Sequence, residues 1–475
     1  MPAQDACGVF GVWAPGEQVS KLAYFGLYAL QHRGQESAGI AVSDGSLILV
    51  FREMGLVAQV FNEPTLDSLR GHIAIGHTRY STTGNSNWEN AQPTFRTTAS
   101  GHIALTHNGN LVNTGDLIKM IQNYAVSRGE LLSSDDAITR TGVSDTEVIT
   151  SLLAASPDLP IESTALQVLP KLEGAFSLVF MDEQTLFTAR DRHGIRPLVL
   201  GRLERGWVLA SETAALDIIG ASYVREVEPG ELIAIDEHGL RSSRFAEASQ
   251  RTCVFEYVYL ARPDTVISGK NVNAARVEVG KVLAKEAPAE ADLVIPVPES
   301  GTPAAIGYAT ESGIPFAQGL VKNPYVGRTF IEPSQSIRQI GIRLKLNPLK
   351  EIIAGKRLVV VDDSIVRGNT QRAIVRMLRE AGATEVHVRI ASPPVQWPCF
   401  LGVDFATKSQ LIAAGLDISE IKQTIGADSL AYVSMQGLIG STGLPKSKLC
   451  RACFDNEYPV DPPEALMHES PLLEL

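Results

Sequence analysis

The chain has 475 residues, which at about 150 residues per domain gives a prior of roughly three domains, or two large ones. Hydrophobic residues make up 44% of it and charged residues 20%, which excludes a disordered, collagen-like or coiled-coil chain. The net charge of −11 would repel a phosphate backbone, so we expect no nucleic acid as a partner. There is no apolar run of about 18 residues and no signal-peptide pattern, so we expect a cytoplasmic protein without a membrane span.

The first half, from Lys21 to about Leu240, contains mostly short apolar segments separated by turn residues, which is typical of strands. Residues 117–124 and 148–153 instead place their apolar side chains on one face of a helix. The pattern predicts helices that cover stacked sheets. The predicted strands are Ile73–His77, Ile103–Thr106, Phe176–Phe180, Leu186–Ala189, Leu198–Leu200 and Trp207–Ala210.

After about residue 250 the order changes to strand, turn and helix, which is the pattern of a parallel α/β sheet. The polar stretch Glu237–Arg251 is the expected domain boundary, and we expect the tail Pro459–Leu475 to be flexible. The predicted strands are Leu293–Val297, Leu358–Val361 and Val386–Ile390, and the predicted helices are Gly301–Ala309 and Thr370–Leu378.

The most specific motif is the segment Leu358–Thr370, in which a buried apolar strand is followed by Asp362 and Asp363 and then by a turn into a helix. Open α/β sheets bind their ligands at this end of a strand. The free N–H groups of the helix start suit a phosphate, Arg367 adds positive charge, and Gly368 lets the backbone come close. The two carboxylates suit two parts of one ligand, or Mg²⁺ held through water.

An Asp-Asp pair alone is more often an acidic turn, but the whole segment resembles the phosphoribosyl-pyrophosphate (PRPP) loop of type I phosphoribosyltransferases. Two further segments agree with it: Val294–Pro303 runs from a strand into a small-residue turn, and Gly327–Lys345 has the composition of a basic lid. Taken separately, they fit an ordinary turn and a solvated loop. The resemblance implies that PRPP is bound by Arg328, Lys345, Ser364, Arg367, Gly368 and Thr370, and Mg²⁺ by Ser300, Asp362 and Asp363.

Cys7 is followed by small and apolar residues, and a lone cysteine of this kind is more often a packed structural thiol. The alternative is a nucleophile. If residues 1–6 are a leader that is removed, Cys7 gains a free α-amine. The pKa of such an amine is about 7.7–8.0, so it can take the thiol proton without a histidine.

Four motifs after Cys7 resemble, in order, those of the class II glutamine amidotransferases, which are N-terminal-nucleophile hydrolases with a four-layer αββα fold. The motifs are Gln31–Gly39, Gly76–Thr82, Thr106–Leu111 and Ser144–Glu147. The resemblance implies that Cys7 attacks the side-chain amide of glutamine, while the Asn108 side chain and the Gly109 N–H form the oxyanion hole. It also implies that Arg79 holds the α-carboxylate of glutamine and Asp145 its α-ammonium group.

Both halves together resemble the glutamine phosphoribosylpyrophosphate amidotransferases, with an amidotransferase domain over residues 7–245 and a phosphoribosyltransferase domain over residues 246–458. The family implies that ammonia from glutamine passes internally to PRPP and displaces pyrophosphate. The product is 5-phosphoribosylamine, in the first committed step of de novo purine synthesis. Purine nucleotides are the implied inhibitors and a homotetramer or homodimer the implied assembly. The segment Phe255–Asp264 is the implied coupling region, and an edge strand ending at Pro263 is its structural alternative.

Four cysteines remain, of which Cys450 and Cys453 form a Cys-x-x-Cys pair, while Cys253 and Cys399 precede it at a distance. The pair alone fits a zinc half-site, a redox pair or two idle thiols, and even four thiolates do not separate zinc from an iron–sulfur cluster by ligand type. The Bacillus-type branch of the family has a [4Fe–4S] cluster on four cysteines in this order, and a short leader before its nucleophile. The resemblance therefore implies a structural [4Fe–4S] cluster and cleavage after Ala6.

Three other functions stay open. A different class II glutamine amidotransferase would have no use for the segment Leu358–Thr370. A PRPP-binding regulatory protein without catalysis predicts a damaged nucleophile or lid. A salvage phosphoribosyltransferase with an unrelated N-terminal module would be indifferent to glutamine.

Overall fold

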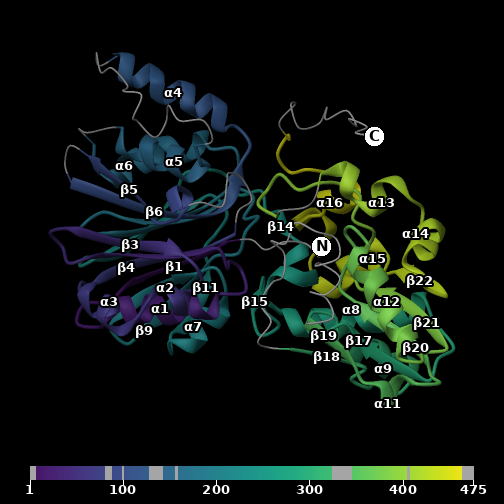
Figure 1. Cartoon of the computed structure of the whole chain (residues 1–475). Helices are drawn as coiled ribbons and strands as arrows, with labels where there is room; N and C mark the ends of the chain where they lie inside the picture. The colour runs from purple at the N-terminus through teal and green to yellow at the C-terminus, as the bar shows by residue number, and fades with distance from the viewer. Residues whose placement is uncertain are drawn as a thin grey trace.

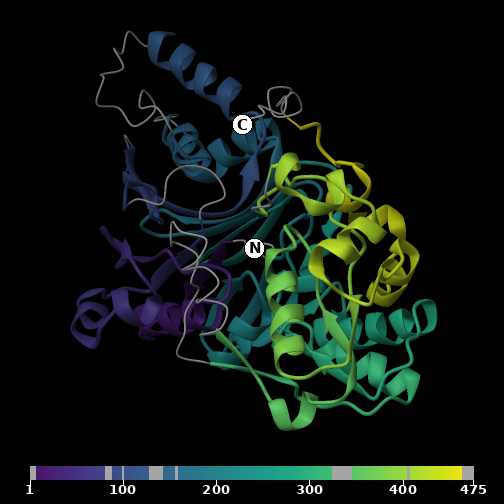
Figure 2. The same cartoon turned by 45° about the vertical axis from the view of Figure 1, so that its right-hand side comes forward.

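The computed structural model describes residues 7–80, 88–98, 101–127, 143–155, 159–323, 345–403 and 407–462. The expected leader 1–6, Arg328 and the tail after residue 462 lie outside these ranges. The two halves of the chain lie side by side, as both views of the ribbon show (Figure 1, Figure 2).

Seven strands of the described part form an antiparallel sheet in the order β11-β9-β10-β1-β4-β2-β3. The strand β1 lies inside this sheet, paired with β10 on one side and with β4 on the other, so residue 7 is held at a central strand end. The strands are β1 (Gly8–Trp13), β2 (Ser37–Ser43), β3 (Ile48–Met54), β4 (Ile73–Arg79), β9 (Val199–Leu203), β10 (Gly206–Ala210) and β11 (Ser222–Glu226).

A second antiparallel sheet, of six described strands, has the order β13-β12-β8-β7-β6-β5. Apolar side chains from β1 and β4 meet those from β7 and β12 between the two sheets, which makes a dry inner layer. The strands of the second sheet are β5 (Thr94–Thr98), β6 (Gly101–Leu111), β7 (Gly174–Met181), β8 (Leu186–Arg190), β12 (Glu231–Asp236) and β13 (Gly239–Arg244).

Helices cover the outer face of each sheet (Figure 1). The first sheet packs against α1 (Val19–Ala29), α2 (Val57–Val60), α3 (Glu63–Ser68) and α7 (Thr213–Ile218). The second sheet packs against α4 (Thr114–Ser127), α5 (Asp145–Ala154) and α6 (Ile161–Val168). The predicted four-layer αββα fold, its two predicted helices and its six predicted strands are therefore confirmed.

In the described part of the second half, four strands form a parallel sheet in the order β17-β20-β21-β22. In the strand β20, Leu358 and Val360 face one helical layer, while Val359 and Val361 face the other. Burial on both faces explains why four apolar residues follow one another here. The elements are β17 (Leu293–Pro296), β20 (Arg357–Asp362), β21 (Glu385–Ile390) and β22 (Ser429–Tyr432), with α8 (Val272–Glu286), α9 (Thr302–Ser312) and α15 (Met435–Thr442) on one face and α12 (Asn369–Glu380) and α14 (Ile418–Ile425) on the other.

The chain leaves the sandwich after β13, which lies within the polar stretch Glu237–Arg251. It then forms β14 and a π-helix (Glu256–Leu260), so the alternative of an edge strand over Phe255–Asp264 is wrong. None of the described helices is both long and apolar enough to cross a membrane. The remaining described strands and α-helices are β14 (Thr252–Cys253), β15 (Val266–Ile267), β16 (Lys270–Asn271), β18 (Leu320–Lys322), β19 (Leu346–Pro348), α11 (Lys350–Ile353), α13 (Ile412–Gly415), β23 (Leu449–Cys450) and α16 (Ala452–Asp455).

Candidate active site

Cys7 lies immediately before β1, with its side chain 8% exposed. Its Sγ donates a hydrogen bond to the carbonyl oxygen of Tyr80 at 3.3 Å. Burial raises the pKa of the Cys7 thiol, and the nearby Arg79 acts in the opposite direction. At neutral pH the residue is therefore a thiol, which needs a base before it can attack.

Asn108 and Gly109 lie near the end of β6 and pair with Ser177 and Phe176 of β7. The Asn108 side chain is fully buried, and neither its Nδ2 nor its Oδ1 has a hydrogen-bond partner among the described residues. An unpaired buried amide is costly, so its retention points to a ligand that completes it. Gly109 has φ +150°, and a Cβ there would lie 2.0 Å from the carbonyl oxygen of Ala175. Only glycine fits at this position.

Two charged residues accompany Cys7. Arg79 is buried at the end of β4, and its Nη1 lies 3.9 Å from a carboxylate oxygen of Glu36, which the sequence did not single out. Asp145 starts α5 and accepts from the N–H groups of Leu111, at 3.2 Å, and of Thr146, at 2.8 Å. The charges of both Arg79 and Asp145 act on the Cys7 thiol, so the fold brings the three predicted residues together.

Asp145 is held in its ionised form. Burial opposes ionisation, but the charge of His107 and the hydrogen bonds outweigh it and lower the pKa of Asp145. The His107 Nδ1 lies 3.5 Å from an Asp145 oxygen. An ionised carboxylate of this kind suits an ammonium group.

Two histidines in the predicted motifs have structural positions that the motifs did not reveal. His77 of β4 is fully buried, and its Nε2 lies 3.1 Å from the carbonyl oxygen of His107, which links the two sheets beside Asn108. Burial lowers the pKa of His77 to about 3, so this ring is neutral at neutral pH.

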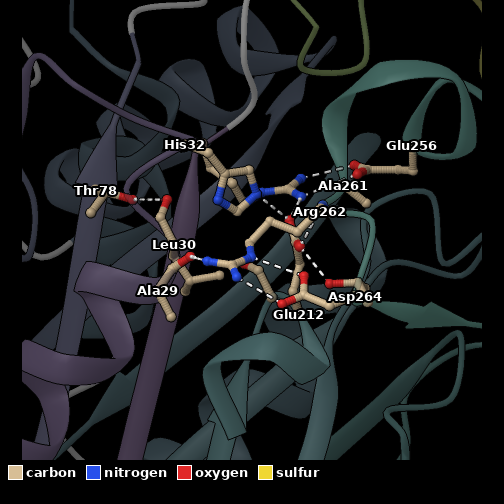
Figure 3. A network of polar contacts seen from close by, with 12 residues as sticks. Ala29, Leu30, His32, Thr78, Glu212, Glu256, Ala261, Arg262 and Asp264 are labelled. Atoms are coloured by element: carbon tan, nitrogen blue, oxygen red, sulfur yellow. Dashed lines mark hydrogen bonds and ion pairs between the residues drawn. The ribbon is translucent and has the colours of Figure 1, made fainter. Parts of the chain in front are cut away.

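A buried ionic network joins Cys7 to the second half of the chain. Arg33 donates from Nε to the carbonyl oxygen of Cys7 at 3.1 Å, and from Nη2 to Glu256 of the π-helix at 2.8 Å. Its Nη1 also donates to Glu212. Figure 3 shows the part of the network around Glu212, which also binds His32 at 2.8 Å and the backbone N–H of Arg262 at 2.9 Å. The sequence predicted none of these pairs, because their members are far apart along the chain.

The candidate phosphate site lies at the carboxyl end of β20. The carboxylates of Asp362 and Asp363 are both buried, and an Asp362 oxygen accepts from the N–H of Asp363 at 2.9 Å. Asp363 accepts from the Ser364 hydroxyl at 2.5 Å, and the Ser300 hydroxyl also bonds to it. Burial, together with the neighbouring carboxylate, raises the pKa of Asp362 well above its ordinary value, and burial raises the pKa of Asp363. Oxygen donors in this arrangement suit Mg²⁺.

The turn after these carboxylates leads into α12, with Gly368 at φ +77° as the residue before the helix. Arg367 donates to Gln410 at 2.6 Å, while its buried Nε has no partner among the described residues. Thr370 lies in the first turn of α12. The next residue, Gln371, donates from Nε2 to Asp362, a contact that the sequence did not predict.

A pocket connects this site with the π-helix, since Ser300 and Asp363 line it together with Tyr257, Val258 and Arg276. Lys345 lies directly before β19, and the neighbouring strand β18 ends at Lys322, whose Nζ is 3.8 Å from Glu299. The other predicted lid residue, Arg328, falls outside the described residues.

The four remaining predicted cysteines are free thiols. Cys253 in β14 and Cys450 in β23 are register partners, and Cys453 lies in α16. Burial raises the pKa of Cys253 to about 11. Burial, followed by the nearness of Cys253, Cys399 and Cys450, raises the pKa of Cys453 well above its ordinary value. The four thiols therefore lie near one another, although within the described ranges no three metal-ligand side chains gather closely enough to hold a single ion.

Comparisons with known proteins cover both halves. The glutamine amidotransferase domain family matches residues 77–217, and the phosphoribosyl transferase domain family matches residues 274–391. The amidophosphoribosyltransferase of Mycobacterium tuberculosis is 62% identical over 97% of this chain and 87% of its own length. That of Bacillus subtilis is 45% identical over 96% of this chain and 94% of its own length.

Solved structures agree with these relatives. A structure of the Bacillus subtilis glutamine phosphoribosylpyrophosphate amidotransferase, complexed with ADP and GMP, matches with a TM-score of 0.87 and 45% identity. The match covers 96% of this chain and 98% of the chain in the solved structure. The chain therefore belongs to the amidophosphoribosyltransferase family, whose members act in purine biosynthesis.

Proposed function

We propose that the chain hydrolyses glutamine at Cys7 and transfers the ammonia to PRPP, forming 5-phosphoribosylamine, glutamate and pyrophosphate. The observation that carries the proposal is the buried Asn108 amide, which has no partner among the described residues. Asn108 follows His107, whose ring lies 3.5 Å from Asp145, and the charges of Asp145 and Arg79 act on Cys7. An unpaired amide donor beside a nucleophile is what acyl transfer requires.

Glutamine binds through its charged ends. The Arg79 guanidinium holds the α-carboxylate in place of its contact with Glu36, and the ionised Asp145 holds the α-ammonium group. These two contacts align the side-chain amide with the Cys7 sulfur. An amide that lacks the α-carboxylate or the α-ammonium group would bind poorly, because Arg79 or Asp145 would then have no partner on the substrate.

Cys7 then attacks the amide carbon. Removal of residues 1–6 gives Cys7 an α-amine, which takes the thiol proton as the sulfur–carbon bond forms. The oxygen that gains negative charge accepts from the Asn108 side chain and the Gly109 N–H. The carbon–nitrogen bond breaks, ammonia leaves with the proton, and water hydrolyses the thioester to glutamate.

Ammonia attacks C1 of PRPP at the second site, and the C1–oxygen bond to pyrophosphate breaks. The helix start after Gly368, together with Ser364, Arg367 and Thr370, binds the 5-phosphate. Arg328 and Lys345 are the further PRPP-binding residues that the family resemblance implies.

Mg²⁺ is the implied cation of this site. The donors fit Mg²⁺, because Ser300, Asp362 and Asp363 offer hard oxygen atoms. Burial and the neighbouring carboxylate raise the pKa of Asp362, and a bound cation would favour its ionised form. When bound, the ion neutralises charge on the pyrophosphate.

A [4Fe–4S] cluster on Cys253, Cys399, Cys450 and Cys453 is the second implied group. The donor set fits, because all four ligands are thiols from three separate segments that meet around β14 and β23. A cluster of four irons does not require its thiolates to converge on one point. Its role would be structural, since these ligands would join the segment of Cys450 and Cys453 to Cys253 and Cys399. Iron and sulfide analysis of anaerobically purified protein tests this, and zinc without iron would contradict it.

Regulation and assembly are further parts of the proposal. Purine nucleotides are the proposed inhibitors, supported by the relative that was solved with ADP and GMP. A homotetramer, or a homodimer, in the cytoplasm is the assembly that the family resemblance implies. Activity titrations with AMP, ADP and GMP, and mass measurement of the native assembly, test these two points.

The central experiment measures glutamate and pyrophosphate release from anaerobically purified protein, with and without PRPP and Mg²⁺. We expect PRPP to stimulate glutamate release, with pyrophosphate formed in equal amount. Glutamate release indifferent to PRPP would favour another class II amidotransferase. Pyrophosphate release indifferent to glutamine would favour a salvage enzyme, and the absence of both would favour a regulatory protein. Intact mass tests the leader, since active protein that retains Met1–Ala6 would exclude the α-amine as base.

A further inference from the structure

The loop of residues 399–402 begins at one of the four grouped cysteines and ends against the candidate oxyanion hole. Gly402 is buried at φ +93°, and a Cβ built on it would lie 2.9 Å from Cα and 3.0 Å from the carbonyl carbon of Gly109. The two glycine backbones are therefore in direct contact, although they belong to different halves of the chain.

A hydrogen bond strengthens this contact. Asn110, the residue after Gly109 on β6, donates from Nδ2 to the carbonyl oxygen of Phe400 at 2.9 Å. On its other side, Gly109 lies against the carbonyl of Ala175 on β7. Gly109 is thus enclosed between its own sheet and the loop of residues 399–402.

The same loop is joined to Cys7. Arg196, which is fully buried, donates from Nε and Nη2 to the carbonyl oxygen of Leu401 at 3.0 and 2.8 Å. Its Nη1 donates to Glu256 at 3.2 Å, and Glu256 binds Arg33, which holds the Cys7 carbonyl. Both the nucleophile and the oxyanion hole are therefore connected to one loop.

A hydrogen bond within the loop closes its start. The N–H of Leu401 donates to the Cys399 Sγ at 3.4 Å. Cys399 is therefore joined to the residue whose carbonyl oxygen accepts from Arg196.

We propose that residues 399–402 are a positioning segment for glutamine hydrolysis: they hold the Gly109 N–H at the place where the oxyanion forms. This inference rests on the proposed function. Oxyanion donors act only when aimed at the developing charge, and a shift of about 1 Å in an active site is enough to cost about 10²-fold in rate. Through this segment, glutamine hydrolysis depends on a loop of the second half of the chain, which carries the candidate PRPP site.

The test substitutes Gly402→Ala, with Gly355→Ala as the matched control. Both glycines have positive φ, +93° and +74°, but a Cβ at Gly355 meets nothing within 4 Å, so the control adds backbone strain without the contact. We expect Gly402→Ala to lower kcat for glutamate release at least about tenfold, with little change in the KM for glutamine. Pyrophosphate release driven by ammonium salt is expected to stay close to that of the control.

A second readout separates the oxyanion hole from the nucleophile. Alkylation of Cys7 by iodoacetamide, followed by mass spectrometry of the Cys7 peptide, needs the thiol but no oxyanion donor. We expect the same alkylation rate in Gly402→Ala and in Gly355→Ala. If Gly402→Ala fails to fold, Asn110→Ala removes the bond to Phe400 without adding an atom, and it is expected to lower kcat in the same way.

Three outcomes would overturn the inference: glutamate release equal in the two glycine variants, equal loss of the glutamine and ammonium reactions, or a rise in KM with kcat unchanged. The first of these counts only against the positioning segment, because the wild-type protein then still hydrolyses glutamine. Wild-type protein that releases no glutamate would instead contradict the proposed function itself.

Discussion

The two candidate sites balance their charges in different ways. At the Cys7 site, groups of the chain itself stabilise the charge state of each residue. The charge of His107 and hydrogen bonds keep Asp145 ionised, and burial keeps His77 neutral. At the end of β20, Asp362 and Asp363 lie next to each other in a buried position, and the pKa of each carboxyl is raised. Arg276 acts against this shift at Asp363 but does not reverse it.

This difference indicates what each site requires from its ligands. The first site is preorganised by strands that are paired on both sides, so its substrate meets donors that are already in place. In the second site, ionisation of the two buried carboxyl groups is costly until a cation binds, so the ligands supply the missing positive charge. Substitutions in the first site are therefore expected to affect rate, while those in the second are expected to affect binding as well.

The largest effect is expected for Cys7→Ala, which should abolish the reaction of the first site and leave that of the second. Cys7→Ala is expected to lower glutamate release on the order of 10⁴-fold or more, because no other group forms the thioester. Pyrophosphate release driven by ammonium salt is expected to stay within about twofold, because added ammonia replaces the ammonia that Cys7 would produce and Cys7 takes no part in the second reaction. Both rates are measured on the same preparation. Equal loss of the two would mean that the sites are not separable.

Asp362→Asn is the reciprocal substitution. It removes a charge from the strand end, and we expect pyrophosphate release to fall on the order of 10²- to 10³-fold. Glutamate release in the absence of PRPP is the internal control and is expected to change little. A titration of Mg²⁺ distinguishes loss of the cation from misfolding, because only the former shifts the concentration needed for half-maximal rate.

The neutral His77 makes the stability of the first half depend on pH. Folding lowers its pKa from 6.5 to about 3 because the ring is buried. Between these values the unfolded chain binds a proton that the folded chain does not, so stability falls as the pH drops below 6.5. From pH 7 to pH 5, the free energy of unfolding of the wild type is expected to fall about 2 kcal/mol more than that of His77→Gln. Urea unfolding at both pH values measures this, and parallel profiles would contradict it.

The smallest expected effect concerns Gln371, which contacts Asp362 rather than a ligand. Gln371→Ala leaves the carboxylate without its amide partner, and we expect the KM for PRPP to rise roughly tenfold. Gln423→Ala is the matched control, because Gln423 is an exposed glutamine on α14. A KM equal to that of the control would mean that the contact does not orient Asp362.

Much of this architecture was predictable from short segments. The run Leu358–Val361 had to be a strand buried on both faces, and Asp362 and Asp363 had to follow at its end, because both features are local. The stretch Glu237–Arg251 was harder to interpret. It contains β13, a partly exposed strand with few apolar residues, which composition alone does not distinguish from a linker. Family membership confirmed the predicted enzyme class, whereas the roles of individual residues remain predictions.

The sequence by itself determined what depends on neighbours along the chain: the period of each strand and helix, the glycines that turns require, and the order of the motifs. Only the tertiary structure decided which distant residues meet. Glu256 reaches Arg33, and Gly402 reaches Gly109, across hundreds of residues, because two independently patterned halves pack together. Periodicity records which face of an element is buried, but it carries no information on the partner, since burial is non-directional. Buried charges and close backbone contacts are therefore where the three-dimensional structure adds most.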